Sequence, residues 1–146
     1  MTDALYTTDI LRLAADVPRL DRLDAPDYHA RKVSPICGSR VDVDIKITDG
    51  IVSDYGQAVR ACALGQAAAS IMGAQAIGLP LEDFPSIAEH MAAFLKGDVQ
   101  DPPRAFRAAH VFAPAKTYKS RHASILLPFQ AMTDIAQKAA AAAPAA

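Results

Sequence analysis

The stretch RVDVDIKITDGIVSDYGQAVR, residues 40–60, decides the fold. In its first half apolar residues alternate with polar ones, which is the period-two pattern of a half-buried strand. The apolar positions are Val41, Val43, Ile45 and Ile47. Asp49-Gly50 then supplies the two positive φ angles of a type I′ turn, so residues 51–60 are expected to return antiparallel to residues 40–48.

Segments on both sides of this hairpin carry clear patterns. On the N-terminal side, the sequence predicts a short amphipathic helix over Thr8–Ala15 and a first strand over Tyr28–Ser34. On the C-terminal side the period changes, and small and apolar residues predict a helix that begins at Ala63 and stops at Gly78.

The remainder of the chain is expected to be helical. A second long helix should begin near Pro85 and end at Gly97, and a short helix is expected up to His110 before Pro114 stops it. The last helix should occupy much of residues 120–143. Pro128 falls inside that pattern, so the helix either begins close to Ser124 or is kinked at the proline.

This order of elements predicts an α+β fold, a small three-stranded antiparallel sheet with helices packed on one face. The chain of 146 residues is expected to form one domain, residues 1–146. Residues 1–27 would be an N-terminal helix and connection, and the alanine-rich residues 139–146 a frayed tail.

Composition excludes several classes of function. Fifteen basic against sixteen acidic residues give a formal net charge of -1, which offers no global attraction for nucleic acid or for an anionic membrane. Residues 61–81 carry no charge, but glycine, glutamine, serine and proline interrupt them and argue against a membrane span. The N-terminus shows no secretory signal, so a cytoplasmic location is expected.

Cys37 and Cys62 are the two cysteines of the chain. Cys37 lies in a loop-like stretch before the strand Arg40–Thr48, and Cys62 ends the next strand and opens a helix. Unsatisfied N–H groups and the helix dipole at such a helix start favour a thiolate. The two sulfurs are therefore expected to converge at one end of the sheet, although two unrelated thiols packed as small apolar residues remain the plain alternative.

Five segments around these cysteines resemble the U-type iron-sulfur cluster assembly scaffold family. They are Pro35-Ile36-Cys37-Gly38-Ser39-Arg40, Asp42-Val43-Asp44-Ile45-Lys46-Ile47, Ala61-Cys62-Ala63, residues 67–72 (AAASIM) and residues 121–131 (RHASILLPFQA). The long interval between Cys62 and the last segment is similar to the SufU branch. The resemblance implies a SufE/NifU-like fold.

The resemblance also implies a site of three cysteines and one aspartate, of which this chain keeps two cysteines. The family's third cysteine falls on Ser124 or on Ala123, depending on the alignment, and its aspartate falls on Ser39. Cys37 and Cys62 are then the residues expected to bind iron or a transient iron-sulfur cluster, and His122 is the candidate third metal ligand. Ser39 and Ser124 would be weak neighbours.

Three functions stay open at this point. The first is a non-enzymatic scaffold that binds iron or a nascent cluster at Cys37 and Cys62. The second is a zinc-bound sulfur acceptor that stimulates a cysteine desulfurase, and the third is a degenerate, metal-free interaction module. The resemblance implies a cysteine desulfurase and acceptor apoproteins as partners, with Lys116, Lys119 and Arg121 as a basic docking patch. An acyl-transfer enzyme with a Cys-His pair is disfavoured, because no motif fixes an orienting group.

Overall fold

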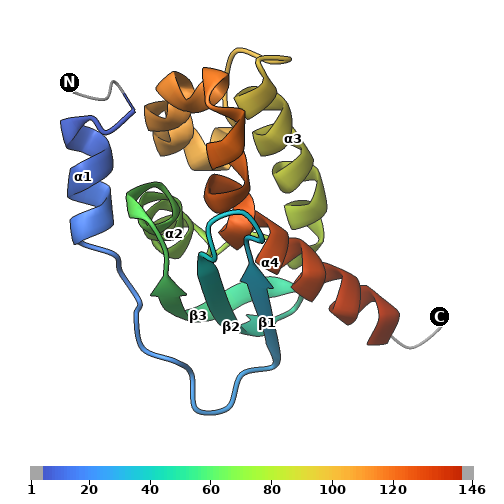
Figure 1. The fold of residues 1–146 in the computed structure, drawn as a ribbon. Helices are drawn as coiled ribbons and strands as arrows, with labels where there is room; N and C mark the ends of the chain where they lie inside the picture. Colours follow the sequence, from blue (N-terminus) through green and yellow to red (C-terminus); the bar gives the residue numbers. More distant parts are fainter. Residues whose placement is uncertain (1–4, 143–146) are drawn as a thin grey trace.

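The expected α+β architecture is confirmed in a computed structural model, which describes residues 5–142 (Figure 1). Helix α1 spans Thr8–Ala15 and is followed by strands β1 (Tyr28–Val33), β2 (Arg40–Thr48) and β3 (Ile51–Arg60). The chain then forms helices α2 (Ala63–Gln75), α3 (Phe84–Lys96) and α4 (His122–Ala142). A 3-10 segment, Arg104–Thr117, links α3 to α4.

The three strands form one antiparallel sheet in the order β1-β2-β3. Asp49 and Gly50 connect β2 to β3 with φ angles of 53° and 77°, which is the turn geometry that the Asp-Gly pair predicts. Val41 pairs with Val59 and Arg40 with Arg60 at the far end of the hairpin. The register therefore places the start of β2 beside the end of β3, where Cys62 follows.

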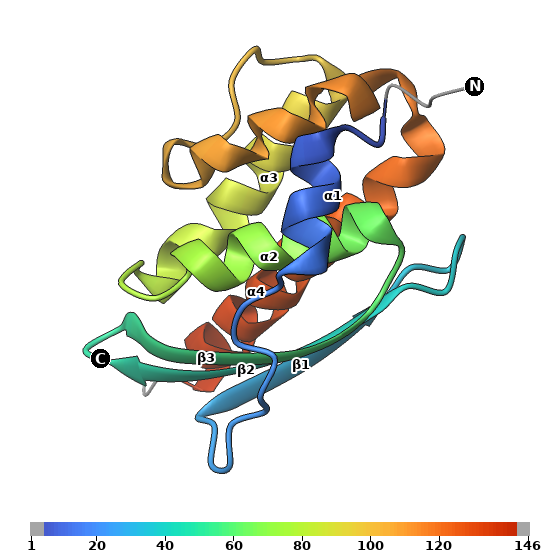
Figure 2. The ribbon, with the colours of Figure 1, turned by 90° about the vertical axis from the view of Figure 1, so that its left-hand side faces the viewer.

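The helices cover one face of the sheet, as Figure 2 shows. Alternate residues of β2 point into this layer, and Val41, Val43 and Ile45 are fully buried there. The small residues of α2 allow it to lie close to its neighbours, and Ala67, Ala68 and Met72 have no exposed surface. This core holds both the β2–β3 hairpin and the start of α2 in place.

The other face of the sheet is not open to solvent at its centre, which differs from the half-buried strand that the sequence predicts. Asp42 and Asp44 of β2 are 2% and 0% exposed. The connection between α1 and β1 crosses this face in Figure 2, and Arg22 from this connection forms an ion pair with Asp44. Period-two patterning identifies the strand, but it carries no information about a distant loop that covers the polar face.

Two other segments differ from the expectation. The 3-10 segment continues past Pro114 to Thr117, because a proline removes one N–H donor without ending a run of short turns. Helix α4 begins at His122, so that Pro128 lies within its first two turns, and it continues to Ala142 through part of the stretch expected to fray. Residues 143–146 of that expected tail lie outside the described residues.

No helix of residues 5–142 combines the length and the apolar composition that crossing a membrane requires.

Candidate functional site

Cys37 lies at the tip of the loop that joins β1 to β2. This loop closes on itself through two backbone hydrogen bonds, from Ser34 N to Ser39 O at 2.7 Å and from Gly38 N to Ser34 O at 2.9 Å. Gly38 has a φ of 74°, in the left-handed region that favours glycine. The tight loop therefore presents Cys37 outward, and its side chain is exposed as the sequence predicts.

Two serine hydroxyls contact the sulfur of Cys37. The Sγ atom lies 2.9 Å from Ser124 Oγ and 3.0 Å from Ser39 Oγ. Both serines are buried, at 2% and 4% exposure, so their hydroxyl groups have few other partners. Ser39 comes from the same loop, whereas Ser124 comes from the first turn of α4.

These hydroxyls favour the charged form of Cys37. Hydrogen bonds from Ser124 first, and then from Ser39, lower the pKa of the thiol from its ordinary value of 9.0 to about 6, while partial burial acts in the opposite direction. The Ser34 hydroxyl makes a smaller contribution of the same sign. At neutral pH Cys37 is therefore mainly a thiolate, which is the nucleophilic and metal-binding form of cysteine.

Cys62 lies in the same pocket as Cys37, so the expected convergence of the two cysteines is found. Cys62 is the N-cap residue of α2 and is partly buried against the core. Its backbone N–H donates to Ser39 Oγ at 3.4 Å. A cavity of about 260 Å³ is lined by Cys37, Gly38, Ser39, Arg60, Ala61 and Cys62, and we call it the thiol pocket.

Gly65 of α2 lies where the start of α2 meets the first turn of α4. A Cβ atom added to Gly65 would lie 2.7 Å from Ala61 Cβ and 3.5 Å from the carbonyl oxygen of Ser124. The space is tight only towards Ala61, while the carbonyl oxygen of Ser124 is at ordinary van der Waals distance, so the start of α2 and the first turn of α4 pack against each other here. This packing holds Ser124 next to the sulfur of Cys37, although the two residues are far apart in the sequence.

Of the two positions that could replace a third cysteine, Ser124 is the one in contact with Cys37. The structure thus resolves the alternative between Ala123 and Ser124. Sequence spacing alone could not, since one residue of shift along a helix changes the direction of a side chain by about 100°.

His122 is half-buried beside the pocket but does not line it. Its Nε2 atom donates to the backbone carbonyl of Ala115 at 2.8 Å, which leaves Nδ1 as the nitrogen free to bind a ligand. Within residues 5–142, no three His, Cys, Asp or Glu side chains are grouped as metal ligands. The donors that the structure brings together are therefore two cysteines and the serine hydroxyls.

The basic residues expected to form a docking patch lie in the segments that lead into α4. Lys116 Nζ lies 4.5 Å from the centre of the Phe94 ring, in a cation-π contact. Lys119 is exposed and Arg121 is half-buried in the turn that precedes α4. Lys119 and Arg121 belong to the short 3-10 turn that directly precedes α4.

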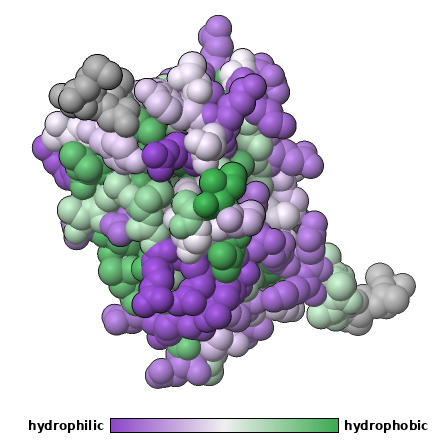
Figure 3. Space-filling model, viewed as in Figure 1, coloured by the Kyte–Doolittle hydropathy of each residue, from purple (hydrophilic) through white to green (hydrophobic). Residues whose placement is uncertain are grey.

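The surface around the Cys37 loop is partly apolar. Val33, the last residue of β1, is 53% exposed, and Ile36, next to Cys37 in the turn, is 67% exposed. In Figure 3 apolar surface gathers at the middle of the face, where Figure 1 places the β1–β2 loop, above a hydrophilic band over the sheet. Exposed apolar side chains next to a reactive thiol are typical of a contact surface.

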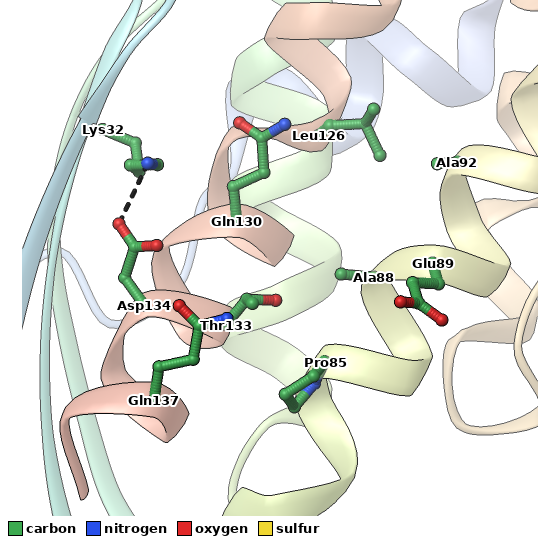
Figure 4. Close-up of a pocket in the computed structure, with 10 residues that line it drawn as sticks. All are labelled: Lys32, Pro85, Ala88, Glu89, Ala92, Leu126, Gln130, Thr133, Asp134 and Gln137. Atoms are coloured by element: carbon green, nitrogen blue, oxygen red, sulfur yellow. Dashed lines mark ion pairs between the residues drawn. The ribbon is translucent and has the colours of Figure 1, made fainter. Parts of the chain in front are cut away.

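A second cavity, of about 460 Å³, lies between α3 and α4 (Figure 4). Ala88, Ala92 and Leu126 give it an apolar floor. The Lys32 ammonium pairs with Asp134 at 3.0 Å on its rim, as the dashed line in the figure marks. The cavity contains neither cysteine, so it is separate from the thiol pocket.

The fold agrees with that of known proteins. A family model described as "NifU-like N terminal domain" matches residues 5–124. The chain belongs to the NifU-like N-terminal domain family. No curated protein matches the chain significantly.

Solved structures support the same assignment. A crystal structure of a "Nitrogen-fixing NifU-like protein (N-terminal)" from Brucella abortus is 37% identical to the chain, covers 97% of it and 98% of its own length, and has a TM-score of 0.91. A putative iron-sulfur cluster assembly scaffold protein for the SUF system from Fervidobacterium islandicum is 16% identical. It covers 90% of this chain and 96% of its own, has a TM-score of 0.82 and shows the shared fold.

These matches confirm the resemblance to the U-type scaffold family and the fold it implies. Proteins of this NifU-like family are assembly scaffolds and not enzymes, so that expectation is confirmed as well. The family supports a general role in iron-sulfur cluster assembly. The contact of Ser124 with Cys37 agrees with its expected place at the third-cysteine position, whereas the buried, unpaired hydroxyl of Ser34 was not predicted from the sequence.

Proposed function

We propose that this NifU-like chain receives sulfur or iron at Cys37 and Cys62 and passes it on during cluster assembly. The thiol pocket is the observation that carries the proposal, because it joins an exposed thiolate to a second cysteine at a helix start. Thiolates bind iron and take up sulfur, and an exposed position lets the cargo enter and leave.

Two thiolates complete only part of a metal site. A nascent cluster on Cys37 and Cys62 needs further ligands, which its own sulfide or a partner protein would supply. His122 would join as a third protein ligand only through Nδ1, since its Nε2 is bonded to Ala115. A resident zinc ion fits less well, because structural zinc sites use four protein ligands and catalytic sites use three.

A sulfur acceptor is the second candidate function. The two serine contacts to Cys37 favour it, because hydroxyl groups are weak metal ligands at neutral pH but good donors to an anionic sulfur. In this form the chain takes sulfur from a cysteine desulfurase and delivers it to acceptor apoproteins. The exposed Val33 and Ile36 beside the thiol give such a partner an apolar surface to contact.

Anaerobic reconstitution tests the proposal and separates its two forms. Purified protein is incubated in one sample with ferrous iron and sulfide, and in another with a cysteine desulfurase and cysteine. Cluster absorption in the first sample supports the scaffold, whereas sulfur on Cys37 in the second supports the acceptor. The matched variants are Cys37→Ala and Cys62→Ala, with Cys62→Ser keeping a hydroxyl at the second position.

The proposal is wrong if wild-type protein takes up neither iron nor sulfur, or if both alanine variants take up as much as the wild type. Desulfurase binding that survives in the double alanine variant, with no uptake by the wild type, would instead identify a metal-free interaction module.

A further inference from the structure

Two buried serine hydroxyls contact the sulfur of Cys37, and a third buried serine, in the same loop, has a hydroxyl without a partner. Ser39 and Ser124 contact Sγ at 3.0 and 2.9 Å. Ser34 is 1% exposed, and its Oγ atom makes no hydrogen bond with any described residue. Its hydroxyl makes a small contribution to the lowered pKa of Cys37, which agrees with a place near the thiol.

A buried hydroxyl without a partner is uncommon, because removing it from water costs free energy that a hydrogen bond normally offsets. Ser34 lies in the closed loop that also presents Cys37, and its backbone N–H and C=O are both bonded within that loop. The loop therefore fixes the residue in place while its side chain remains unsatisfied. A group that arrives at Cys37 would find this hydroxyl free to donate.

The three serines offer hydrogen-bond donors, which suit an anion and not a metal cation. Each hydroxyl has one rotatable O–H donor, so the exposed sulfur has two buried donors in contact with it and a third, unsatisfied donor in the same loop. Hydrogen bonds to an ionised acceptor are stronger than bonds between neutral groups. The arrangement is thus suited to an additional negative charge next to Sγ, and it adds no soft ligand for a metal cation.

We propose that Ser34, Ser39 and Ser124 form a hydroxyl cradle that holds the outer, negatively charged sulfur of a persulfide on Cys37. The proposal rests on the proposed function and names its cargo as sulfane sulfur. It also assigns a role to the two positions where the family's aspartate and third cysteine are replaced. Ser39 and Ser124 act as positioning residues, and Ser34 supplies the additional donor.

The transfer step balances without an added oxidant or reductant. The Cys37 thiolate attacks the outer sulfur of a donor persulfide, a new S–S bond forms at Cys37, and the S–S bond of the donor breaks. The donor leaves as a thiolate that keeps the electron pair of the broken bond. A proton on the outer sulfur either remains on that sulfur or is lost to water. The product on Cys37 is a persulfide whose outer sulfur is an anion at neutral pH.

The lifetime of that persulfide tests the cradle. Inorganic polysulfide is used as the sulfur donor, and the protein is desalted and then treated with glutathione. Trypsin cleavage after Lys32, Arg40 and Arg60 puts Cys37 and Cys62 on separate peptides. Mass spectrometry then follows the loss of one sulfur atom from the Cys37 peptide.

The variants are Ser34→Ala, Ser39→Ala and Ser124→Ala, and Ser70→Ala is the matched control. Ser70 is also buried, but its hydroxyl donates to Asp16 O, far from the pocket in the sequence. Each cradle variant is expected to lose sulfur about tenfold to a hundredfold faster than the wild type, as loss of a hydrogen bond to a charged group implies. The control should keep the wild-type rate, and circular dichroism checks that every variant is folded.

Equal rates in the wild type and in all three folded cradle variants would overturn the cradle and leave sulfur uptake by Cys37 intact. A faster loss in Ser70→Ala as well would also overturn it, since the effect would then be a general loss of stability. A wild-type protein that takes no sulfur on Cys37 would overturn both the cradle and the sulfur-acceptor form of the proposed function.

Discussion

Cys37 owes its reactivity to neighbours that are distant in the sequence. Its pKa is lowered to about 6, mainly by the hydroxyl of Ser124 and then by that of Ser39. The charged form therefore predominates above pH 6, and alkylation by iodoacetamide should fall as the pH drops through this value. We expect a midpoint near pH 6 for the Cys37 peptide, measured by mass spectrometry between pH 4 and pH 9.

Ser124→Ala provides the control for that profile. Without its strongest hydrogen bond the thiolate of Cys37 is less stable, so the midpoint should move to higher pH. A profile that is identical in the variant would contradict the role given to Ser124.

Ser124 and Ser39 are also the residues at which metal binding could be restored. Replacing Ser124 by cysteine puts a third sulfur where a hydroxyl now lies 2.9 Å from Cys37 Sγ. We expect Ser124→Cys, alone or with Ser39→Asp, to bind about one iron or zinc ion per chain, because three convergent ligands hold such ions well. Metal analysis after desalting measures this, with Ser70→Cys as the control. No gain over the control would contradict the geometry of the pocket.

At the scale of elements, strand β2 depends on a buried carboxylate. Asp44 accepts hydrogen bonds from Arg22 Nη2 at 3.0 Å, Leu23 N at 3.2 Å and His29 Nδ1 at 2.8 Å. Burial alone would raise the pKa of Asp44, but the bonds from Arg22 and His29 prevail and lower it. We expect Asp44→Asn to reduce the free energy of unfolding by about 2 kcal/mol at pH 7, measured by urea denaturation.

The difference in free energy of unfolding between the wild type and Asp44→Asn should change with pH in one direction only. Because the pKa of Asp44 is lower in the folded chain, its contribution is complete above the unfolded value of about 4 and is lost as the pH falls through the folded value. The difference between wild type and Asp44→Asn should therefore shrink in acid. Asp54→Asn, at an exposed carboxylate of β3, is the control. A difference that grows in acid would disprove the assignment.

Strand β3 also needs a glycine where the α1–β1 connection crosses it. A Cβ atom at Gly56 would lie 2.3 Å from the backbone carbonyl oxygen of Asp21 and 3.2 Å from Leu23. Since a backbone atom cannot move aside without shifting the connection, Gly56→Ala should lower the free energy of unfolding by about 2 kcal/mol or more. Thermal denaturation checks this against Ser53→Ala, an exposed position of the same strand. An unchanged melting temperature would contradict the crossing.

At the scale of the whole molecule, the sequence predicts what depends on near neighbours. The alternation in residues 40–48 and the Asp-Gly turn predict the hairpin and hence the place of Cys62 beside Cys37. The features that the sequence pattern does not predict depend on contacts between segments that are far apart along the chain. The connection that buries Asp44 leaves no local pattern in the sequence, and only the family resemblance, through the third-cysteine position, indicates that Ser124 lies near Cys37.

The molecule as a whole joins a rigid core to one reactive loop. The core fixes β2, β3 and the start of α2, so the thiol pocket is held at one end of the sheet while Cys37, Val33 and Ile36 face outward. This arrangement fits a protein that exchanges cargo with partners at its surface.

In the proposed function, Cys37 and Cys62 form one site that takes up sulfur or iron for cluster assembly. Native mass spectrometry under anaerobic conditions tests it most directly, on protein incubated with ferrous iron, a cysteine desulfurase and cysteine. We expect added sulfur, with or without iron, on the wild-type chain, and a loss of that added mass in Cys37→Ala. An unmodified wild-type mass, or the same added mass on Cys37→Ala, would contradict it.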